Sequence, residues 1–564
     1  MIQKKVLVIG LDGATFDIIN PLIEKGKLPN IAKLMKTGSY GELLSTVPHL
    51  SPVAWTSFFT GCNPGKHGIF DFFHKIKGSY SVKINNFNHC KTKGIWDYLN
   101  ESASKVIAIN IPNTYPPPKI DGCFISGLGT PNKEVQYCYP PELKDEIIEK
   151  FGTFEMLTEI QHSDKLMHRY IAGRDRVIKN QTDVVKYLLK NKPWDLFIHV
   201  FTITDSIQHD CWKYIDNTHP NYSKHMNKNY GHIIDETYEM VDQAIGEFLK
   251  EVSDDTTVVL LSDHGQGPLK KTLSLNNVLK SKGYLCFKDN ANVESQLSLK
   301  INRIISKAKK IPMYIVSKFL TKKQKDKLFF HIKEEMVEAF FKKAEDYLAS
   351  IDWSKTKAYC EGSFSLIYLN KRDFYPEGIV NKADEKKIKE ELKDIFMNLK
   401  DNETGENITE AIYEPHEIYK GDYIENAPDL IIILKKGYHG SGSIDRVLFN
   451  IKEDEFFSSH QWSGFHVPEG IFVLNDKKRI KADNKINDAK IIDLTPTILY
   501  LMGKDVPKEI DGKVLKNCVN ETFLQTNAPK FSDETVYANK NFEDSFSEEE
   551  DENVKKQLSD LGYL

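Results

Sequence analysis

The stretch KVLVIGLDG, residues 5–13, is an apolar run that ends at a charged residue and a glycine. Uninterrupted apolar runs of this kind are typical of a strand that is buried on both faces of a parallel sheet. Residues 16–38, which follow, have the spacing of apolar side chains that is expected of helices. The stretch therefore predicts a first strand that ends in Asp12, with a helical connection after it.

The same alternation of apolar runs and helical patterns continues along the chain. Further strands are predicted at 105–112, 122–127, 194–202, 256–265, 427–434 and 469–474. Apolar strands separated by amphipathic helices predict an α/β fold with a mostly parallel sheet and helices on both faces. Ligands bind beyond the carboxyl ends of the strands in such sheets, so the side chains at those ends are the first candidates for chemistry.

The length and composition narrow the class of protein. A chain of 564 residues can form two or three domains, or one large core with insertions. Its 40% hydrophobic and 28% charged residues are typical of a soluble protein, and its net charge of −4 argues against nucleic acid as a specific partner. The cysteines form no CxxC pair, the N-terminus has no signal-peptide core, and no apolar run reaches the roughly 18 residues of a membrane helix. We therefore expect a cytoplasmic protein with reduced cysteines.

Carboxylate and imidazole side chains gather at the ends of the predicted strands: Asp12, Asp205, His209, Asp263, His264 and His466. Asp205 and His209 are four residues apart and so share one face of a helical turn. Each residue alone is more often a cap or a satisfied polar group than a functional one. Together, three carboxylates and three imidazoles suit zinc or a similar divalent ion, whereas three carboxylates buried without a cation would be costly.

Ser51 stands in PHLSPVAWTSFFTG, residues 48–61, immediately before a predicted helix. The simple interpretation is a helix N-cap, because serine followed by proline is a common helix start. The alternative is a nucleophile, since a serine hydroxyl attacks at neutral pH when a base or a metal favours its alkoxide. Two ions about 4 Å apart can hold the attacking and leaving oxygens in line across phosphorus, so the residue types fit phosphoryl transfer.

Five motifs resemble, in the same order, those of the alkaline phosphatase superfamily, and most closely prokaryotic members of its type I phosphodiesterase/nucleotide pyrophosphatase branch. They are VIGLDG (8–13), SPVAWTSFFTGCNPGKHGIFDF (51–72), TDSIQHDCW (204–212), LLSDHGQG (260–267) and IIDLTPTILYLMGKDVPKEIDGKVL (491–515). The resemblance implies an α/β fold with an alkaline-phosphatase-like core and an inserted cap region.

The resemblance also implies a two-metal site. Asp205, His209 and His466 match the ligands of one ion. The other ion matches Asp12, Asp263 and His264, with Ser51 as a further ligand and as the nucleophile. Ser51 stands where the nucleotide pyrophosphatases usually carry threonine, and His460 and His439 compete with His466 for the last position. The implied cofactors are two divalent ions, zinc first and manganese as the alternative.

The residues near Ser51 depart from the pyrophosphatase pattern. Positions 52–54 are Pro, Val and Ala, where those enzymes often carry an asparagine that contacts phosphate. Arginine is scarce near the motifs, which favours a phosphodiester over a dianionic monoester. Lys66 and His67, in the motif NPGKHG, could contact phosphate, although turns rich in glycine are more often structural.

We therefore expect a phosphodiesterase or nucleotide pyrophosphatase that acts through Ser51. The alternatives are a phosphomonoesterase, a phosphotransferase or phosphomutase that uses the same metal site, or a non-catalytic relative that binds phosphorylated ligands. The expected substrate is a small phosphorylated molecule: a nucleotide, a lipid head group or a glycan-linked phosphate. Nothing in the sequence indicates an oligomeric state.

The predicted domain organisation is a core formed by 1–285 and 427–518, a cap or lid region at 286–426, and a C-terminal extension at 519–564. Residues 300–327 carry ten lysines and arginines and one acidic residue. This stretch predicts either a solvated insertion or an amphipathic segment that contacts an anionic membrane surface. The acidic stretch at 543–552 is expected to be exposed, with a short helix after it.

Overall fold

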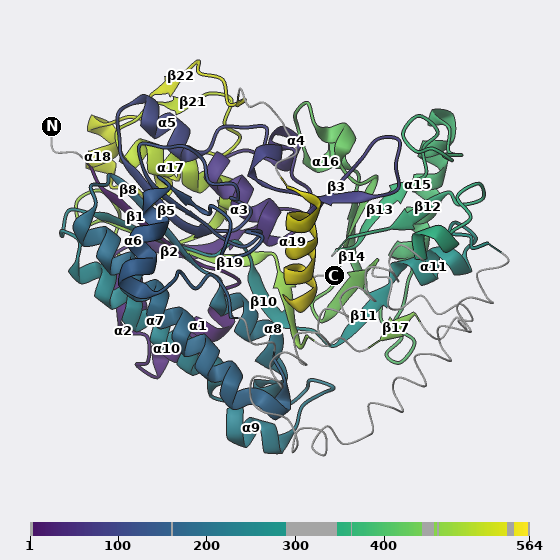
Figure 1. The fold of residues 1–564 in the computed structure, drawn as a ribbon, viewed down its shortest axis with the longest axis horizontal. Coiled ribbons are helices and arrows are strands. Elements are labelled where there is room, and N and C mark those ends of the chain that lie inside the picture. Colours follow the sequence, from purple (N-terminus) through teal and green to yellow (C-terminus); the bar gives the residue numbers. More distant parts are fainter. Residues whose placement is uncertain are drawn as a thin grey trace.

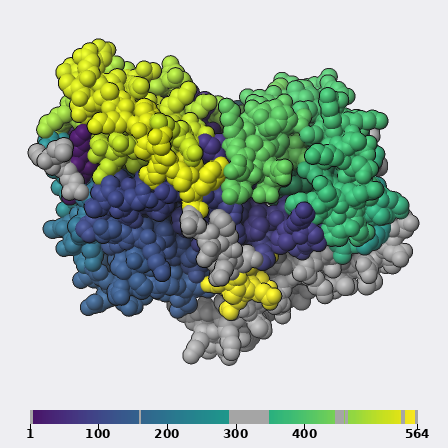
Figure 2. Space-filling model, turned by 90° about the horizontal axis from the view of Figure 1, so that it is seen from above, coloured from purple at the N-terminus to yellow at the C-terminus, as the bar shows by residue number. Residues whose placement is uncertain are grey.

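The computed structural model describes residues 4–158, 162–288, 347–362, 364–442, 456–458, 462–538 and 546–561. They form a large lobe around one wide sheet and a smaller lobe around a second sheet (Figure 1). In the space-filling view the surface is notched between the two lobes (Figure 2). The basic stretch at 300–327 and His460 lie outside the described residues.

The wide sheet has nine strands. Their order is β20 (Asn484–Lys490), β2 (Ser39–Leu44), β19 (Glu469–Asn475), β9 (Thr257–Leu261), β1 (Val6–Leu11), β8 (Leu196–Phe201), β5 (Val106–Ile111), β6 (Gly122–Ser126) and β7 (Cys138–Tyr139). The central run from β9 to β6 is parallel, whereas β19 and β7 are antiparallel to their neighbours. The predicted α/β fold class with a mostly parallel sheet is confirmed.

Helices cover both faces of this sheet (Figure 1). One face packs against α1 (Phe16–Glu24), α2 (Pro29–Lys36), α6 (Glu142–Phe151), α7 (Met167–Asn191) and α10 (Ile233–Lys250), and the other against α3 (Ser51–Thr60), α5 (Ile95–Glu101) and α17 (Leu494–Leu501). Strand β1 contributes side chains to the core on each face of the sheet. Leu7 and Ile9 pack in the core beneath the first group of helices, and Val6 and Val8 pack in the core beneath the second. Successive side chains of a strand point to opposite faces, which explains why its sequence is apolar throughout.

The smaller lobe contains a four-stranded antiparallel sheet in the order β12 (Ala358–Cys360), β13 (Leu366–Leu369), β15 (Leu430–Leu434) and β14 (Thr409–Tyr413), with α15 (Lys382–Met397) against β14. Strand β15 therefore differs from the expectation for 427–434, which placed this apolar run at the return to the core. An apolar run identifies a buried strand but not the sheet in which it pairs. The domain boundaries stay a prediction.

Short elements complete the two lobes. They are α4 (Pro64–His67), α8 (Ile203–Ile215), α9 (Lys224–Tyr230), α11 (Leu275–Ser281), α16 (Pro415–Ile418), α18 (Glu521–Thr526), β3 (Phe73–Lys75), β4 (Val82–Ile84), β21 (Val506–Pro507) and β22 (Phe531–Ser532). A three-stranded sheet has the order β16 (Tyr438–Ser441), β11 (Lys271–Ser274) and β17 (Phe457–Ser458).

The C-terminal helix α19 (Glu548–Leu561) lies between the two lobes (Figure 1). In the described part of the acidic stretch, Glu548, Glu549 and Glu552 are exposed as expected, whereas Glu550 and Asp551 are partly buried. Glu550 accepts a hydrogen bond from the Tyr115 hydroxyl, and Asp551 accepts one from the backbone N–H of Ile84.

All eight cysteines are free thiols. Within the described ranges, the helices are too short or too polar to span a bilayer. The cytoplasmic location stays a prediction.

Candidate active site

Three neighbouring parallel strands place the predicted site residues together. Asp12 follows β1, and Asp263 and His264 follow β9, the neighbour of β1. On the other side of β1, strand β8 leads into helix α8, which carries Asp205 and His209 on one face. Because parallel strands end at the same edge of the sheet, residues far apart in the chain meet there.

A short antiparallel pair brings in the last histidine. Strand β10 (Gly265–Pro268) pairs with β18 (Gly464–Val467), with Gln266 opposite His466. The ring of His466 stacks on that of His264 with the centroids 3.6 Å apart. His439 instead packs its ring against Phe465 at 3.9 Å and belongs to neither of the clusters described below.

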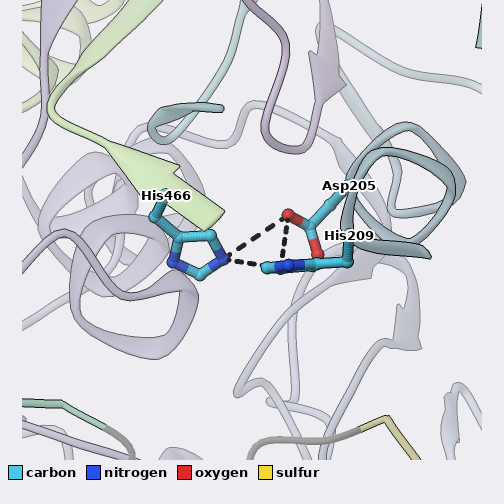
Figure 3. A group of neighbouring side chains, drawn as sticks. All are labelled: Asp205, His209 and His466. Atoms are coloured by element: carbon cyan, nitrogen blue, oxygen red, sulfur yellow. Dashed lines mark hydrogen bonds and ion pairs between the residues drawn. The ribbon is translucent and has the colours of Figure 1, made fainter. Parts of the chain in front are cut away.

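The first cluster consists of Asp205, His209 and His466 (Figure 3). Asp205 Oδ1 lies 3.2 Å from His209 Nε2 and 3.5 Å from His466 Nε2, and the two Nε2 atoms are 3.0 Å apart. Each Nδ1 faces a backbone carbonyl oxygen, that of Gly464 at 2.7 Å and that of His49 at 3.0 Å. A carbonyl only accepts, so each Nδ1 carries its hydrogen, and the two facing Nε2 atoms must share a proton or a metal ion.

The protonation states of this cluster favour metal binding. Burial opposes ionisation of Asp205, but the imidazoles of His209 and His466 outweigh it and hold the pKa of this carboxyl well below its usual range. Burial also lowers the pKa of His466 well below the usual value, with the neighbouring His264 adding to the effect. A neutral His466 beside an ionised carboxylate is the protonation state in which both bind a metal.

The second cluster surrounds His264. Its Nε2 lies 3.2 Å from Asp263 Oδ2 and 3.7 Å from Asp12 Oδ1, while its Nδ1 faces the Gly265 carbonyl at 3.0 Å. Asp205 also has a carboxylate oxygen within reach of Asp12 and His264. The structure thus joins the two predicted ligand sets through Asp205, which the sequence assigned to one ion alone.

Buried like charges show why a cation suits this second cluster. Burial, with the carboxylates of Asp263 and Asp205 nearby, raises the pKa of Asp12 well above its usual value, and burial likewise raises that of Asp263. Within the described part of the chain, neither Asp12 Oδ1 nor Asp263 Oδ2 has a hydrogen-bond partner. Buried carboxylates are normally paired or bound to metal, so these orphaned oxygens and the imidazole form a donor set that fits a divalent ion.

Ser51 is the first residue of α3 and is only 1% exposed. The N-cap position belongs to Leu50, and no side chain caps this helix end. The capping interpretation of the hydroxyl is therefore wrong. Ser51 Oγ lies 3.3 Å from His264 Nε2 and lines the same cleft as Asp12, Asp205 and His209.

Trp55, one turn beyond Ser51, is a site residue that the sequence pattern did not single out. Its Nε1–H donates a hydrogen bond of 3.1 Å to Asp12 Oδ2, and the side chain is fully buried. The ring lies against Gly10 of β1, where a Cβ would come within 2.4 Å of the indole carbon Cη2. Gly10 in the VIGLDG motif therefore makes room for the ring that holds Asp12.

The other polar residues of this region serve the fold. Thr56 Oγ1 donates to the Pro52 carbonyl, and Ser57 Oγ lies 2.8 Å from His67 Nε2. Lys66 Nζ donates to Asp511 Oδ1 at 2.7 Å. Lys66 and His67 are thus engaged away from the cleft, in line with the structural role that is more common for turns rich in glycine.

The cleft at this site has a volume of about 600 Å³. Its lining extends from the two Asp/His clusters to residues 128–134, the segment around Met156, Trp462 and helix α19. Trp462 stacks on the His209 ring with the centroids 4.0 Å apart. Sequence patterns did not reveal this wall, because its members lie far apart in the chain and carry no shared motif.

Comparison with known proteins agrees with this geometry. The family model described as "Type I phosphodiesterase / nucleotide pyrophosphatase" matches residues 6–463. No curated protein sequence matched the chain. Among solved structures, the phosphonoacetate hydrolase of Sinorhizobium meliloti 1021, in complex with phosphonoformate, has a TM-score of 0.52 at 12% identity, covering 89% of this chain and 95% of that one. This likeness shows the fold, an alkaline-phosphatase-like core.

Two ectonucleotide pyrophosphatase / phosphodiesterase 5 structures are also similar. The human protein has a TM-score of 0.49 at 11% identity and covers 92% of this chain and 100% of its own. An inactive variant of the murine protein, in complex with AMP, has a TM-score of 0.46 at 10% identity and covers 89% of this chain and 95% of its own.

Proposed function

Because the chain belongs to the type I phosphodiesterase / nucleotide pyrophosphatase family of the alkaline phosphatase superfamily, and is therefore a phosphoric ester hydrolase, we propose that it cleaves phosphodiester or pyrophosphate bonds with Ser51 as nucleophile and two divalent metal ions as cofactors. One observation carries the proposal. The Ser51 hydroxyl caps no helix and instead lies 3.3 Å from His264 Nε2, among three buried carboxylates at the end of a cleft.

The family is metal-dependent, and the donor set of each cluster fits a divalent ion. Asp205, His209 and His466 would hold one ion. Asp12, Asp263 and His264, with the Ser51 hydroxyl, would hold the other. Mixed nitrogen and oxygen ligands favour zinc, with manganese as the alternative. When bound, the ions supply positive charge to the attacking and leaving oxygens.

Ser51 is positioned to attack phosphorus. Its place at the N-terminus of α3 puts the partial positive charge of the helix beside the developing anion. Attack by Oγ forms an Oγ–P bond as the ester oxygen departs, and water then hydrolyses the phosphoserine ester and restores the hydroxyl. Trp55 keeps Asp12 oriented during both steps through its hydrogen bond to Oδ2.

The cleft favours a diester over a dianionic monoester. Among the described residues that line it there is no arginine, and its ammonium groups are Lys133 and Lys556. A dianionic phosphate is held best by a bidentate guanidinium, which this lining lacks. A cleft of about 600 Å³ accommodates a substrate of nucleotide size, so we propose a small phosphorylated molecule such as a nucleotide, a lipid head group or a glycan-linked phosphate.

Acid quenching of the working enzyme tests the proposal. The zinc- or manganese-loaded protein is mixed with bis(p-nitrophenyl) phosphate, quenched in acid and digested. We expect a phosphoryl adduct on the peptide that contains Ser51, and faster turnover of this diester than of p-nitrophenyl phosphate. An added alcohol that becomes phosphorylated in place of water would show a transferase instead. Turnover without any adduct, and undiminished in Ser51→Ala, would disprove the serine nucleophile.

A further inference from the structure

Helix α19 is docked on the molecule along one face. Val554 and Leu558, one turn apart, are completely buried in the core cluster that also contains Leu50 and Leu128. Phe546, just before the helix, stacks on Tyr115 with the ring centroids 5.7 Å apart. Together with the hydrogen bonds to Glu550 and Asp551 described above, these contacts hold the helix in one position.

The face of α19 that is not buried lines the catalytic cleft. Asn553, Lys556, Gln557 and Leu561 contribute to its wall, at the spacing of one helical face. Gln557 Oε1 accepts a hydrogen bond of 3.3 Å from the backbone N–H of Gly129. Gly129 lies in the 128–134 segment that lines the same cleft, so the helix and this segment form a continuous wall.

Charge is distributed unevenly along this cleft. Asp12 and Asp205 belong to the metal clusters, and Asp210 follows His209 directly in the chain. Bound ions would offset the negative charge of these carboxylates. Along the 128–134 segment and α19, the lining carries two ammonium groups, Lys133 and Lys556, and one carboxylate, Glu134. Lys133 forms an ion pair with Glu155 Oε2 at 3.1 Å, and Lys556 is the cation on α19 that lines the cleft.

We propose that Lys556 binds a second anionic group of the substrate, beyond the phosphate that is cleaved, so that the C-terminal helix sets a preference for phosphoesters with an additional negative charge. This inference rests on the proposed function, because it takes the cleft to be the substrate site. Lysine suits the role, since its ammonium is a compact charge on a flexible stem that can follow phosphate or carboxylate groups of different geometry.

Two probes that differ by one phosphate test the inference. Adenosine 5′-monophosphate and adenosine 3′,5′-bisphosphate are used as competitive inhibitors of bis(p-nitrophenyl) phosphate hydrolysis by the metal-loaded full chain. The measured quantity is the ratio of their inhibition constants, in which the monophosphate serves as an internal reference for each variant. We expect the wild-type protein to bind the bisphosphate more tightly.

In Lys556→Ala the preference for the bisphosphate, measured as this ratio, should fall about fivefold, the factor that corresponds to the loss of a partly exposed ion pair. Lys556→Arg should keep most of it, and Lys556→Glu should reverse it. Lys555→Ala is the matched control, because Lys555 is the adjacent lysine of the same helix, pairs with Asp551 at 2.7 Å and does not line the cleft. Its ratio should equal that of the wild type.

An unchanged ratio in both Lys556→Ala and Lys556→Glu would overturn the inference and leave α19 a structural wall. Failure of the proposed function has a different signature, because the wild-type protein would then not turn over the diester at all. In that case direct calorimetric titration of the two nucleotides, with zinc present, gives the same ratio without catalysis. Equal affinity of wild type and Lys556→Glu for the bisphosphate there would also overturn the inference.

Discussion

Helix α3 carries two serine–histidine pairs in different surroundings. At its start, Ser51 Oγ lies 3.3 Å from His264 Nε2, beside Asp12 and Asp263 and at the end of a cleft. Near its end, Ser57 Oγ lies 2.8 Å from His67 Nε2, and burial alone lowers the pKa of that histidine to about 3. Among the described residues, the second pair has the shorter contact, but no ion pair joins its imidazole to a carboxylate and it has no place in the cleft lining. A serine–histidine contact therefore indicates chemistry only where charge and substrate access accompany it.

Substitution of the two serines should produce opposite results. Ser51→Ala should lower kcat/KM by about three orders of magnitude or more, because no neighbouring hydroxyl can replace the nucleophile. Its free energy of unfolding should hardly change, since Ser51 caps no helix. Ser57→Ala should keep most activity but lose about 1–3 kcal/mol of stability, because it leaves buried His67 Nε2 without its partner.

Steady-state kinetics and chemical denaturation of the two variants check this prediction. Ser51→Thr is a further control, since a threonine hydroxyl at this position should restore part of the turnover. Near-normal activity in Ser51→Ala, or complete loss in Ser57→Ala, would remove the distinction between the two pairs.

The metal clusters should respond unequally to loss of their carboxylates. Metal analysis of the purified protein should find close to two divalent ions per chain. Asp263→Asn should lower this content to about one, whereas Asp205→Asn should lower both occupancies because Asp205 lies within reach of both clusters. Each variant should lose most of its activity.

Asp242→Asn is the matched control for these substitutions. Asp242 is a buried carboxylate outside the clusters that accepts a 2.8 Å hydrogen bond from the backbone N–H of Ile31. This variant should keep its metal and lose stability. Full activity after removal of metal by a chelator would contradict the two-metal assignment.

Loss of the Trp55 indole should lower activity less than loss of a metal ligand does, but more than loss of a packing contact alone. Trp55→Phe removes the hydrogen bond to Asp12 Oδ2, and activity should fall about 10–100-fold, as for other groups that orient a metal ligand. Trp96→Phe is the control, because Trp96 lies in the same core cluster and its Nε1 has no hydrogen-bond partner among the described residues. Equal kcat/KM in the two variants would mean that Trp55 serves packing alone.

The smallest expected effect concerns Asp401, a carboxylate whose neighbours lower its pKa, whereas the surroundings of Asp12 raise the pKa of that residue. Burial of Asp401 is outweighed by Tyr438 and Lys271, which lower its pKa to about 2 from the usual 3.8. Asp401 therefore stabilises the fold above pH 3.8 and loses this contribution as the pH falls toward 2. Asp401→Asn should cost on the order of 1 kcal/mol at neutral pH and flatten the acid limb of the stability curve, without changing kcat.

Denaturant titrations between neutral and acidic pH measure that contribution. Parallel pH–stability curves for the wild type and Asp401→Asn would show that Lys271 and Tyr438 do not favour the ionised form of Asp401.

The sequence carried most of the information on the large sheet and on the candidate ligands. Continuous apolar runs located β1, β8 and β9, because a strand buried on both faces must be apolar throughout. The rule that ligands lie beyond the carboxyl ends of parallel strands then selected Asp12, Asp205 and Asp263 without any structure. The motif order indicated the family that the comparison confirmed.

Local patterns were insufficient where contacts between distant segments decide the outcome. The run at 427–434 was recognised as a strand, but its pairing with β13 and β14 depends on residues far from it in the chain, such as Leu366, which lies opposite Ile431. His466 and His439 have similar local sequences. The pairing of β10 with β18 places His466, and not His439, beside Asp205 and His209.

The sequence by itself therefore determined which residue types stand at which strand ends, since burial and periodicity are written in neighbouring residues. Only the tertiary structure decided that the Ser51 hydroxyl lies beside His264 instead of capping a helix, that Asp205 lies within reach of both clusters, and that α19 forms a wall of the cleft. Each of these depends on the angle at which separate elements pack. That angle is set by the whole core, because close-packed side chains from every layer must fit at once.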